Sequence, residues 1–171
     1  RNALSARPGS PGMSVIRLVW GSASGPTATA AYDTALAEAN IHNYNIVTVS
    51  SVIPAGPPLE AVGTAPDLGP TGERLTVVQS HQSVPPGESD PAVAGIGWTR
   101  SESGKGLFYE ASGTDREVVR GAITDGLARG KELRDWTFTD GDVIVREADP
   151  GPDEYTSALV CAVYGESTPL L

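Results

Sequence analysis

The run NYNIVTVSSVIP, from Asn43 to Pro54, constrains the fold of this chain more than any other stretch. Its β-branched residues favour an extended strand over 44–51, and a proline, which cannot donate to a sheet ladder, ends the run. Two adjacent serines, Ser50 and Ser51, come at the end of this strand. The stretch therefore predicts a sheet protein with a Ser-Ser pair where a strand gives way to a connection.

Other short runs rich in β-branched and aromatic residues, bounded by Gly and Pro, predict further strands. About seven strands are expected, at 14–20, 44–51, 74–80, 92–100, 106–112, 136–145 and 156–164. The alanine-rich run 27–39 and the segment from 114 to about 130 predict two helices. The last two strands pair most simply as antiparallel neighbours. We expect an α+β fold, a layered αββα-type sandwich of mainly antiparallel strands with two main helices.

Local signals predict the ends and buried faces of the two helices. In the first, Tyr32 and Leu36 lie four residues apart on one face, and Asn40 is expected to end the helix. The second should open with a capping box, in which Thr114 accepts a hydrogen bond from the Glu117 amide. Its buried face should carry residues at a spacing of four: Val119, Ile123 and Leu127.

Several segments predict no regular element. The Pro- and Gly-rich stretch 54–72 is expected to be an ordered surface loop or lid of undefined role, and 81–91 a second connection. Residues 1–12 lack both a core-forming pattern and the apolar centre of a signal peptide, so we expect a disordered tail there. Residues 13–171 should then form a single domain, because this length suits one hydrophobic core.

Charge and composition argue against several classes of protein. The 171 residues include 21 acidic and 12 basic side chains, for a formal charge of −9. Phosphate contacts need clustered Lys and Arg, which this chain lacks, so no nucleic-acid partner is expected. No apolar run approaches the ~20 residues of a membrane helix, so no membrane association is expected. Cys161 is the single cysteine, which excludes an internal disulfide and favours a cytoplasmic location.

Common catalytic groups are also hard to assemble from this sequence. Cys161 lies in the apolar run SALVCAVY and is interpreted as a small buried hydrophobe. Two His and one Cys cannot form a zinc site, and no metal is expected. The Gly-rich turn 21–27 follows a strand but lacks GxGxxG spacing, so it predicts a plain strand-to-helix connection. The Ser-Ser pair is the remaining candidate.

Two adjacent serines can give rise to a cofactor. Decarboxylation of an amino acid requires an electron sink, which a ketone joined to the substrate amine as a Schiff base provides. The Ser51 hydroxyl can attack the Ser50 carbonyl to give an ester. Elimination then leaves dehydroalanine, and hydrolysis of its tautomer releases ammonia and leaves a pyruvoyl group at the new N-terminus. This chemistry needs a strained or polarised peptide and a donor for the oxyanion. A Ser-Ser pair alone is common and usually inert.

The surroundings of the pair carry a family resemblance. Residues 21–56, GSASGPTATAAYDTALAEANIHNYNIVTVSSVIPAG, and residues 106–113, GLFYEASG, are similar to the archaeal-type pyruvoyl-dependent arginine decarboxylases. In that family an Asp on the first helix, an Asn five residues before the first serine, the Ser-Ser cleavage site and a Glu on a later strand recur. The matching positions here are Asp33, Asn45, Ser50 with Ser51, and Glu110.

The resemblance implies cleavage between residues 50 and 51. Ser51 would become the pyruvoyl cofactor at the head of chain 51–171, and Ser50 would end the shorter chain, with neither PLP nor a metal. Glu110 would return a proton to the carbanion after carbon dioxide leaves. That role needs a carboxylic acid kept protonated by apolar neighbours. The sequence offers three of them: Leu107, Phe108 and Tyr109.

The two remaining matches concern hydrogen bonding and substrate binding. Asn45 would donate a hydrogen bond during processing or to the bound substrate, and Asp33 would bind a guanidinium through its carboxylate. An ordinary strand asparagine and an exposed helical acid are the plainer interpretations. Asn45 and Ser51 are six residues apart, or ~20 Å if extended, so they cannot meet within one straight strand. Either the strand bends, or Asn45 serves a neighbouring subunit.

The expected function is self-processing followed by conversion of arginine to agmatine and carbon dioxide through a Schiff base. The resemblance further implies a homotrimer of processed αβ units, with or without a higher assembly. Two alternatives stay open: a pyruvoyl decarboxylase of another amino acid, and an unprocessed, non-catalytic homologue that acts as a structural or regulatory subunit.

Overall fold

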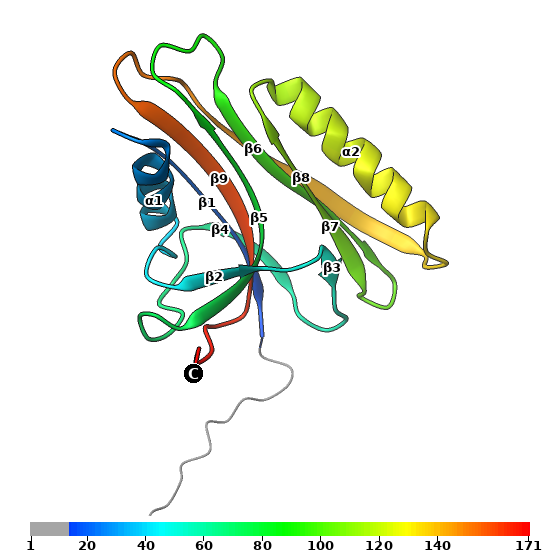
Figure 1. Cartoon of the computed structure of the whole chain (residues 1–171). Coiled ribbons are helices and arrows are strands. Elements are labelled where there is room, and N and C mark those ends of the chain that lie inside the picture. The colour runs from blue at the N-terminus through cyan, green and yellow to red at the C-terminus, as the bar shows by residue number, and fades with distance from the viewer. Residues whose placement is uncertain (1–13) are drawn as a thin grey trace, which may run out of the picture.

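The computed structural model describes residues 14–171, so the tail expected at 1–12 lies outside the described residues. The described part contains two helices and nine strands (Figure 1). In chain order they are β1 (Ile16–Gly25), α1 (Ala28–Glu38), β2 (Asn45–Thr48), β3 (Val52–Ile53), β4 (Leu59–Gly63), β5 (Arg74–Val84), β6 (Ala92–Ser101), β7 (Gly106–Gly113), α2 (Arg116–Glu132), β8 (Phe138–Ala148) and β9 (Tyr155–Tyr164).

The strands form two sheets that face each other. One has the order β2-β5-β9-β1-β4 and the other β3-β7-β6-β8. Only the β2–β5 and β1–β4 pairs are parallel. Helix α1 packs on the outer face of the five-stranded sheet and α2 on that of the four-stranded sheet (Figure 1). The expected αββα sandwich of mainly antiparallel strands is confirmed.

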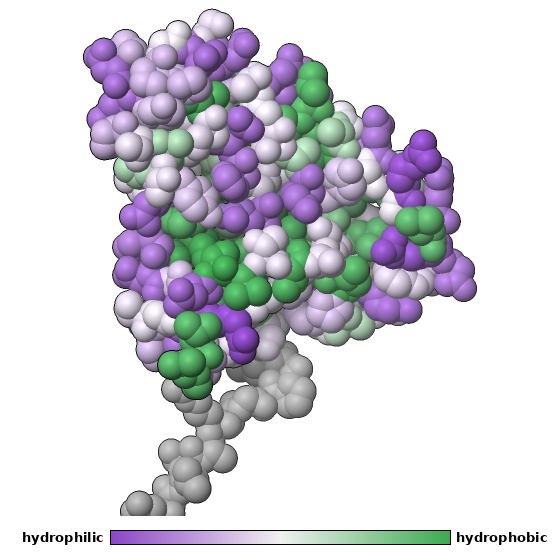
Figure 2. Space-filling view, viewed as in Figure 1, coloured by the Kyte–Doolittle hydropathy of each residue, from purple (hydrophilic) through white to green (hydrophobic). Residues whose placement is uncertain are grey.

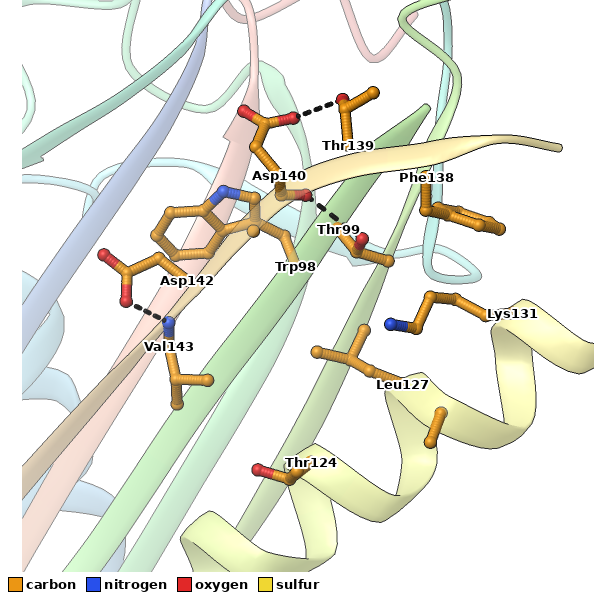
Figure 3. Close-up of a pocket in the computed structure, with 12 residues that line it drawn as sticks. Trp98, Thr99, Thr124, Leu127, Lys131, Phe138, Thr139, Asp140, Asp142 and Val143 are labelled. Carbon is orange, nitrogen blue, oxygen red and sulfur yellow. Dashed lines mark hydrogen bonds between the residues drawn. The ribbon is translucent and has the colours of Figure 1, made fainter. Parts of the chain in front are cut away.

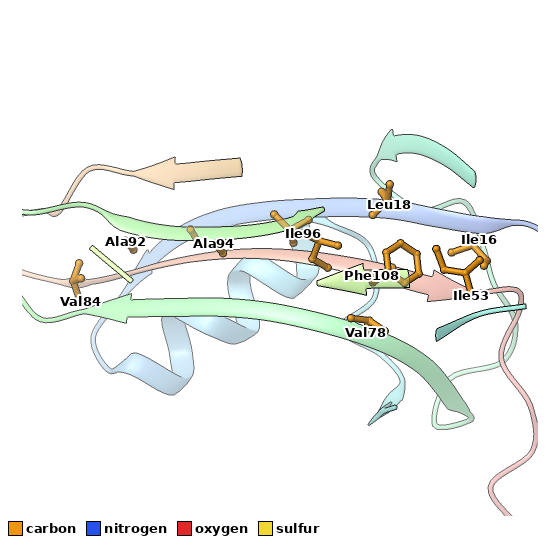
Figure 4. Packing of buried hydrophobic residues seen from close by; sticks show 12 residues of the cluster. Ile16, Leu18, Ile53, Val78, Val84, Ala92, Ala94, Ile96 and Phe108 are labelled. Carbon is orange, nitrogen blue, oxygen red and sulfur yellow. The ribbon is translucent and has the colours of Figure 1, made fainter. Parts of the chain in front are cut away.

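Alternation along the strands sorts side chains between the layers. In β9, Val160 and Ala162 face the space between the sheets, whereas Leu159, Cys161 and Val163 face α1. Figure 4 shows the inter-sheet core, to which both sheets contribute buried side chains. Its labelled members are Ile16, Leu18, Ile53, Val78, Val84, Ala92, Ala94, Ile96 and Phe108. This core ends beside β3 and the neighbouring ends of β7 and β9.

The strand expected over 44–51 ends early, and the β-branched run that contains it is divided between the two sheets. β2 ends at Thr48 and pairs with β5, and β3 begins at Val52 and pairs with β7. The chain crosses from one sheet to the other between these strands. The β-branched run predicts extended backbone throughout, but it carries no signal for which sheet each half joins.

The interpretation of 54–72 as wholly irregular is wrong. Leu59–Gly63 forms β4, which runs parallel to β1 and covers its free edge. Pro57 and Pro58 precede this strand, where the missing N–H groups cost no ladder bonds, and Leu59 packs against the inter-sheet core. Similarly, β5 extends to Val84, into the connection expected at 81–91.

The expected pairing of the last two strands is also wrong. β8 pairs with β6, whereas β9 lies between β1 and β5 in the other sheet. The physical reason is burial: residues 156–163 of β9 are all buried, which requires a central strand covered on both faces. β8 is largely exposed over its first half and forms a sheet edge.

The helix ends follow the sequence with one correction. Asn40 adopts φ 59° directly after α1, as expected of a helix-terminating residue. The N-cap of α2 is Asp115 instead of Thr114, because its carboxylate accepts from the amides of Glu117 and Val118 at 2.9 and 3.1 Å. A negative charge there also suits the helix dipole. The expected buried face is confirmed: Val119, Ile123 and Leu127.

Cys161 is fully buried beneath α1, and burial raises the pKa of its thiol to about 12. Because the thiolate is the reactive form, we expect a thiol reagent at about pH 8 to leave the native protein unlabelled and to label it on unfolding. Mass spectrometry before and after addition of denaturant measures this. Rapid labelling of the native chain would contradict the position of β9 at the centre of its sheet.

Candidate active site

The two serines lie where the chain crosses between the sheets. The Val49 amide still donates to the Val77 carbonyl of β5 at 2.9 Å. Two residues later, the Ser51 carbonyl accepts from the Phe108 amide of β7, also at 2.9 Å. The Ser50-Ser51 bond is thus held from one side by each sheet. Its backbone is anchored although it belongs to no regular strand.

A tight turn surrounds the Ser50-Ser51 bond. The Val52 amide donates to the Ser50 carbonyl oxygen at 3.0 Å, which closes a three-residue γ-turn centred on Ser51. The carbonyl that receives this bond is the one that the Ser51 hydroxyl would attack. An amide donor at this oxygen polarises the carbonyl and can hold negative charge that develops on it. The turn therefore places an amide donor at the carbonyl where self-cleavage is expected.

Glu110 meets Ser51 although 59 residues separate them. The Ser51 hydroxyl donates to Oε2 of Glu110 at 2.7 Å. Alternation along β7 places Glu110 on the same face of the strand as Phe108. Its paired residue on the neighbouring strand β6 is Ile96, which belongs to the inter-sheet core. A carboxylate that accepts from a serine hydroxyl is positioned to take its proton. The structure thus brings together two of the residues expected from the sequence.

The apolar surroundings expected for Glu110 are only partly present. Phe108 is buried on the same face of β7. Leu107 instead packs under α2, and a Cβ on Gly126 of α2 would come within 2.2 Å of the Tyr109 ring. Successive residues of a strand point to opposite faces, so Leu107 and Tyr109 face away from Glu110. Glu110 itself is exposed in the single chain.

Asn45 and Asp33 lie away from this pair. β2 pairs with β5 from Asn45 to Thr48 without a shift in register, so the chain leaves this sheet only after Thr48. The Asn45 amide donates to the Gly72 carbonyl at 2.7 Å and makes no hydrogen bond to Ser51 or Glu110. Asp33 is exposed on α1, on the outer face of the five-stranded sheet. Within one chain, these two residues do not join the site.

Tyr164, at the end of β9, belongs to the site but was not expected from the sequence. Its hydroxyl donates to the Val52 carbonyl at 3.0 Å, and its ring meets Phe108 edge to face, with centroids 6.1 Å apart. Burial, and to a lesser extent the negative charge of Glu110, raise the pKa of Tyr164 to about 12. The available signal was the alternation of SALVCAVY, which points Tyr164 into the space between the sheets.

The surface around the serines is unusually apolar. Val47, Val49 and Val52 are exposed by 39%, 38% and 48%, although each is a large hydrophobic side chain. Figure 2 shows hydrophobic side chains gathered on this face in the region of β2 and β3. A patch of this kind beside reactive groups is typical of a surface that another molecule covers.

Two cavities differ in their relation to the serines. One of about 330 Å³ is lined by Ser50, Ser51, residues of β7 and the C-terminal half of α2. A larger one, of about 450 Å³, lies between β8 and α2. Figure 3 shows that Trp98, Lys131 and Asp142 line it. None of the expected site residues does, so the smaller cavity is the one connected with the Ser-Ser pair.

Neither a metal-ion site nor a membrane-spanning helix is found among residues 14–171. In that range, no group of three or more His, Cys, Asp or Glu side chains could hold a metal ion. Over the same residues, no helix is both long enough and apolar enough to span a membrane.

Comparison with known proteins decides the family. The family described as "Pyruvoyl-dependent arginine decarboxylase (PvlArgDC)" matches residues 15–169. This chain belongs to that family. A pyruvoyl-dependent arginine decarboxylase of Halobacterium salinarum is 45% identical over 157 residues, which cover 91% of this chain and 96% of the relative. The resemblance based on residues 21–56 and 106–113 is confirmed.

More distant relatives carry the same name. Pyruvoyl-dependent arginine decarboxylases of Pyrococcus horikoshii and Thermococcus kodakarensis are 33% and 35% identical over 132 residues. Each alignment covers 73% of this chain and 82% of the relative.

The family name implies a pyruvoyl cofactor, as expected, and not PLP. The residues present fit such a group. The position that would become the pyruvoyl group carries a serine whose hydroxyl meets a carboxylate, and whose preceding carbonyl meets an amide. These are the acceptor and donor that conversion of a pyruvoyl-dependent decarboxylase precursor needs.

Proposed function

We propose that this chain is a self-processing decarboxylase that converts arginine to agmatine and carbon dioxide. The observation that carries the proposal is the hydrogen bond from Ser51 to Glu110 within a turn where the Val52 amide meets the Ser50 carbonyl. The activity on arginine follows from the name that its relatives share.

Processing begins at the Ser51 hydroxyl. Glu110 accepts its proton as Oγ forms a bond to the Ser50 carbonyl carbon, and the Val52 amide stabilises the oxyanion. The carbon–nitrogen bond between residues 50 and 51 then breaks, and the nitrogen leaves as a protonated amine. An ester now joins the Ser50 carbonyl to the Ser51 oxygen. The Glu110 carboxyl remains next to this oxygen, where it can exchange protons in the following step.

Elimination and hydrolysis complete the conversion. Residue 51 loses its α-proton, the carbon–oxygen bond breaks, and Ser50 leaves as a carboxylate. The dehydroalanine left at residue 51 tautomerises to an imine, water adds, and ammonia departs. One water molecule is consumed and one ammonia is released for each chain cleaved. The short chain then ends at Ser50, and the long chain begins with a ketone at position 51.

The same residues suit the decarboxylation that follows. The pyruvoyl group supplies a ketone that joins the substrate amine and draws electrons from the α-carbon as carbon dioxide leaves. The Phe108 amide holds the carbonyl of residue 51, and so fixes the head of the long chain against β7. Glu110, beside the same position, can return a proton to the substrate carbon.

We further propose a homotrimer of processed units with sites between the protomers. Three features support it: Asn45 and Asp33 lie away from Ser51 within one chain, Glu110 is exposed, and apolar valines surround the Ser-Ser pair. A neighbouring subunit would bring Asn45 or Asp33 to the site, where Asp33 binds the guanidinium. It would also cover the exposed Glu110. The cytoplasmic location expected from the sequence stays a prediction.

The substrate assignment predicts that Asp33→Ala lowers kcat/KM for arginine by about 10- to 100-fold, because a charge-assisted hydrogen bond to the guanidinium is lost. Carbon dioxide release and agmatine formation measure it, with ornithine, lysine, histidine and aspartate as competing substrates. Glu38→Ala is the matched control, because Glu38 is another exposed acid on α1. Wild-type kcat/KM in Asp33→Ala would contradict the guanidinium role. Faster turnover of another amino acid than of arginine would contradict the assignment of arginine as the substrate.

A further inference from the structure

Tyr164 connects the two sheets at the point where the chain crosses between them. It is the last residue of β9 in the five-stranded sheet, and its hydroxyl reaches the Val52 carbonyl of β3 in the four-stranded sheet. It is half-buried, and its ring stands edge to face on Phe108 at an interplanar angle of 84°. Phe108 is the residue whose amide holds the Ser51 carbonyl. Tyr164 therefore holds Val52 directly, and it also packs against Phe108, which holds Ser51.

Val52 is the residue through which Tyr164 can act on the scissile bond. β3 has only two residues, so ladder bonds to β7 hold it weakly. The N–H and C=O groups of one strand residue point to the same side, and those of Val52 both have partners outside the ladder. The N–H donates to the Ser50 carbonyl, and the C=O accepts from Tyr164. While Val52 keeps its extended backbone, holding its carbonyl toward Tyr164 also keeps its N–H on that same side.

From this geometry we propose that Tyr164 is a positioning residue for self-cleavage. Resting on the proposed function, this inference gives the Tyr164 hydroxyl a specific part: it holds Val52 so that its amide faces the scissile carbonyl while the Ser51 hydroxyl faces Glu110. Tyr164 touches none of the reacting atoms. Its raised pKa keeps the phenol protonated, and hence a donor, throughout the neutral range.

The variant that isolates this role is Tyr164→Phe, which keeps the ring on Phe108 and removes only the hydroxyl. Tyr44→Phe is the control, because the Tyr44 hydroxyl also donates to a backbone carbonyl, that of Gly69, at 2.9 Å, and in addition accepts from the Leu68 amide at 3.2 Å. Tyr44 packs in the cluster beneath α1, on the opposite face of the five-stranded sheet from Tyr164. Both variants therefore lose a donor bond to a backbone carbonyl, and the control loses one accepted bond more, at a different place.

The precursor is made by cell-free synthesis, and its cleavage is then followed over time by measuring intact mass. We expect Tyr164→Phe to cleave at least about fivefold more slowly than the wild type, and Tyr44→Phe to cleave at the wild-type rate. Since Tyr164 transfers no proton in this account, the ratio of wild-type to variant rates should stay constant from about pH 6 to about pH 9. Thermal unfolding of both substitutions in a Ser51→Ala background measures their effect on stability, and Tyr164→Phe should lose no more stability than Tyr44→Phe, which gives up two hydrogen bonds.

The possible outcomes separate this inference from the function on which it rests. Wild-type precursor that never cleaves would overturn both. A wild type that cleaves, together with Tyr164→Phe that cleaves equally fast, would overturn the role of Tyr164 alone. Equal slowing in Tyr44→Phe, or slowing of Tyr164→Phe matched by a much greater loss of stability than in Tyr44→Phe, would reduce the effect to general destabilisation and overturn it too.

Discussion

Ser51→Ala is expected to remain a single chain and to have no measurable decarboxylase activity. Without the hydroxyl, no ester can form with the Ser50 carbonyl, and no ketone can arise at position 51. The Ser51 side chain donates one hydrogen bond, to the exposed Glu110, so its removal should leave the fold intact. Denaturing electrophoresis and a carbon dioxide release assay on the same preparation measure the two effects.

Ser50→Ala provides the matched control for this substitution. The mechanism uses the carbonyl of Ser50 but not its hydroxyl, and Ser50 is exposed. We therefore expect Ser50→Ala to cleave and to decarboxylate arginine. An active Ser51→Ala chain would refute the origin of the cofactor at this residue. If Ser50→Ala failed to cleave while Ser51→Ala cleaved, the nucleophile would be Ser50 and not Ser51.

Glu110→Gln should produce the second largest loss. Gln keeps the size of the side chain but cannot accept and return a proton as a carboxyl group does. We expect slower cleavage and, in the fraction that does cleave, a kcat reduced by about 10²- to 10⁴-fold with a smaller change in KM. Quantifying the processed fraction by mass before the kinetic assay keeps the two effects apart.

Glu60→Gln is a suitable control for Glu110→Gln, because Glu60 is an exposed strand glutamate on β4 at the far edge of the other sheet. It should cleave and turn over like the wild type. If processed Glu110→Gln retained the wild-type kcat, the hydrogen bond to Ser51 would have no catalytic meaning.

The layers of the fold could be predicted from the sequence because they rest on local periodicity. The spacing of Val119, Ile123 and Leu127 gives the buried face of α2, and short β-branched runs give most of the strands. The pairing of edge strands could not be predicted, because it depends on which strand edges still have unpaired backbone N–H and C=O groups once the sheets have assembled. β4 forms on the open edge of β1 despite its Pro-rich surroundings, and a continuous β-branched run divides between two sheets.

The site was predictable only where a family pattern records long-range contacts. Residue types and spacing alone could not place Glu110 beside Ser51, since the two are 59 positions apart in the sequence; the resemblance named both. The turn at Ser51 is closed by a backbone hydrogen bond, and the Tyr164 hydroxyl bonds to a backbone carbonyl. Neither contact can be predicted from residue types. Asn45 and Asp33 lie away from Ser51 within a single chain. Their predicted roles at the site therefore require a neighbouring subunit.

The measurement that tests the central claim most directly is the intact mass of the purified wild-type chain. We expect two chains, a short one that ends at Ser50 and a long one that begins at residue 51. The long chain should be lighter by one ammonia than a chain that begins with serine, because its first residue is a pyruvoyl group. A chain that stays whole after prolonged incubation, or a long fragment that begins with an intact serine, would contradict the account.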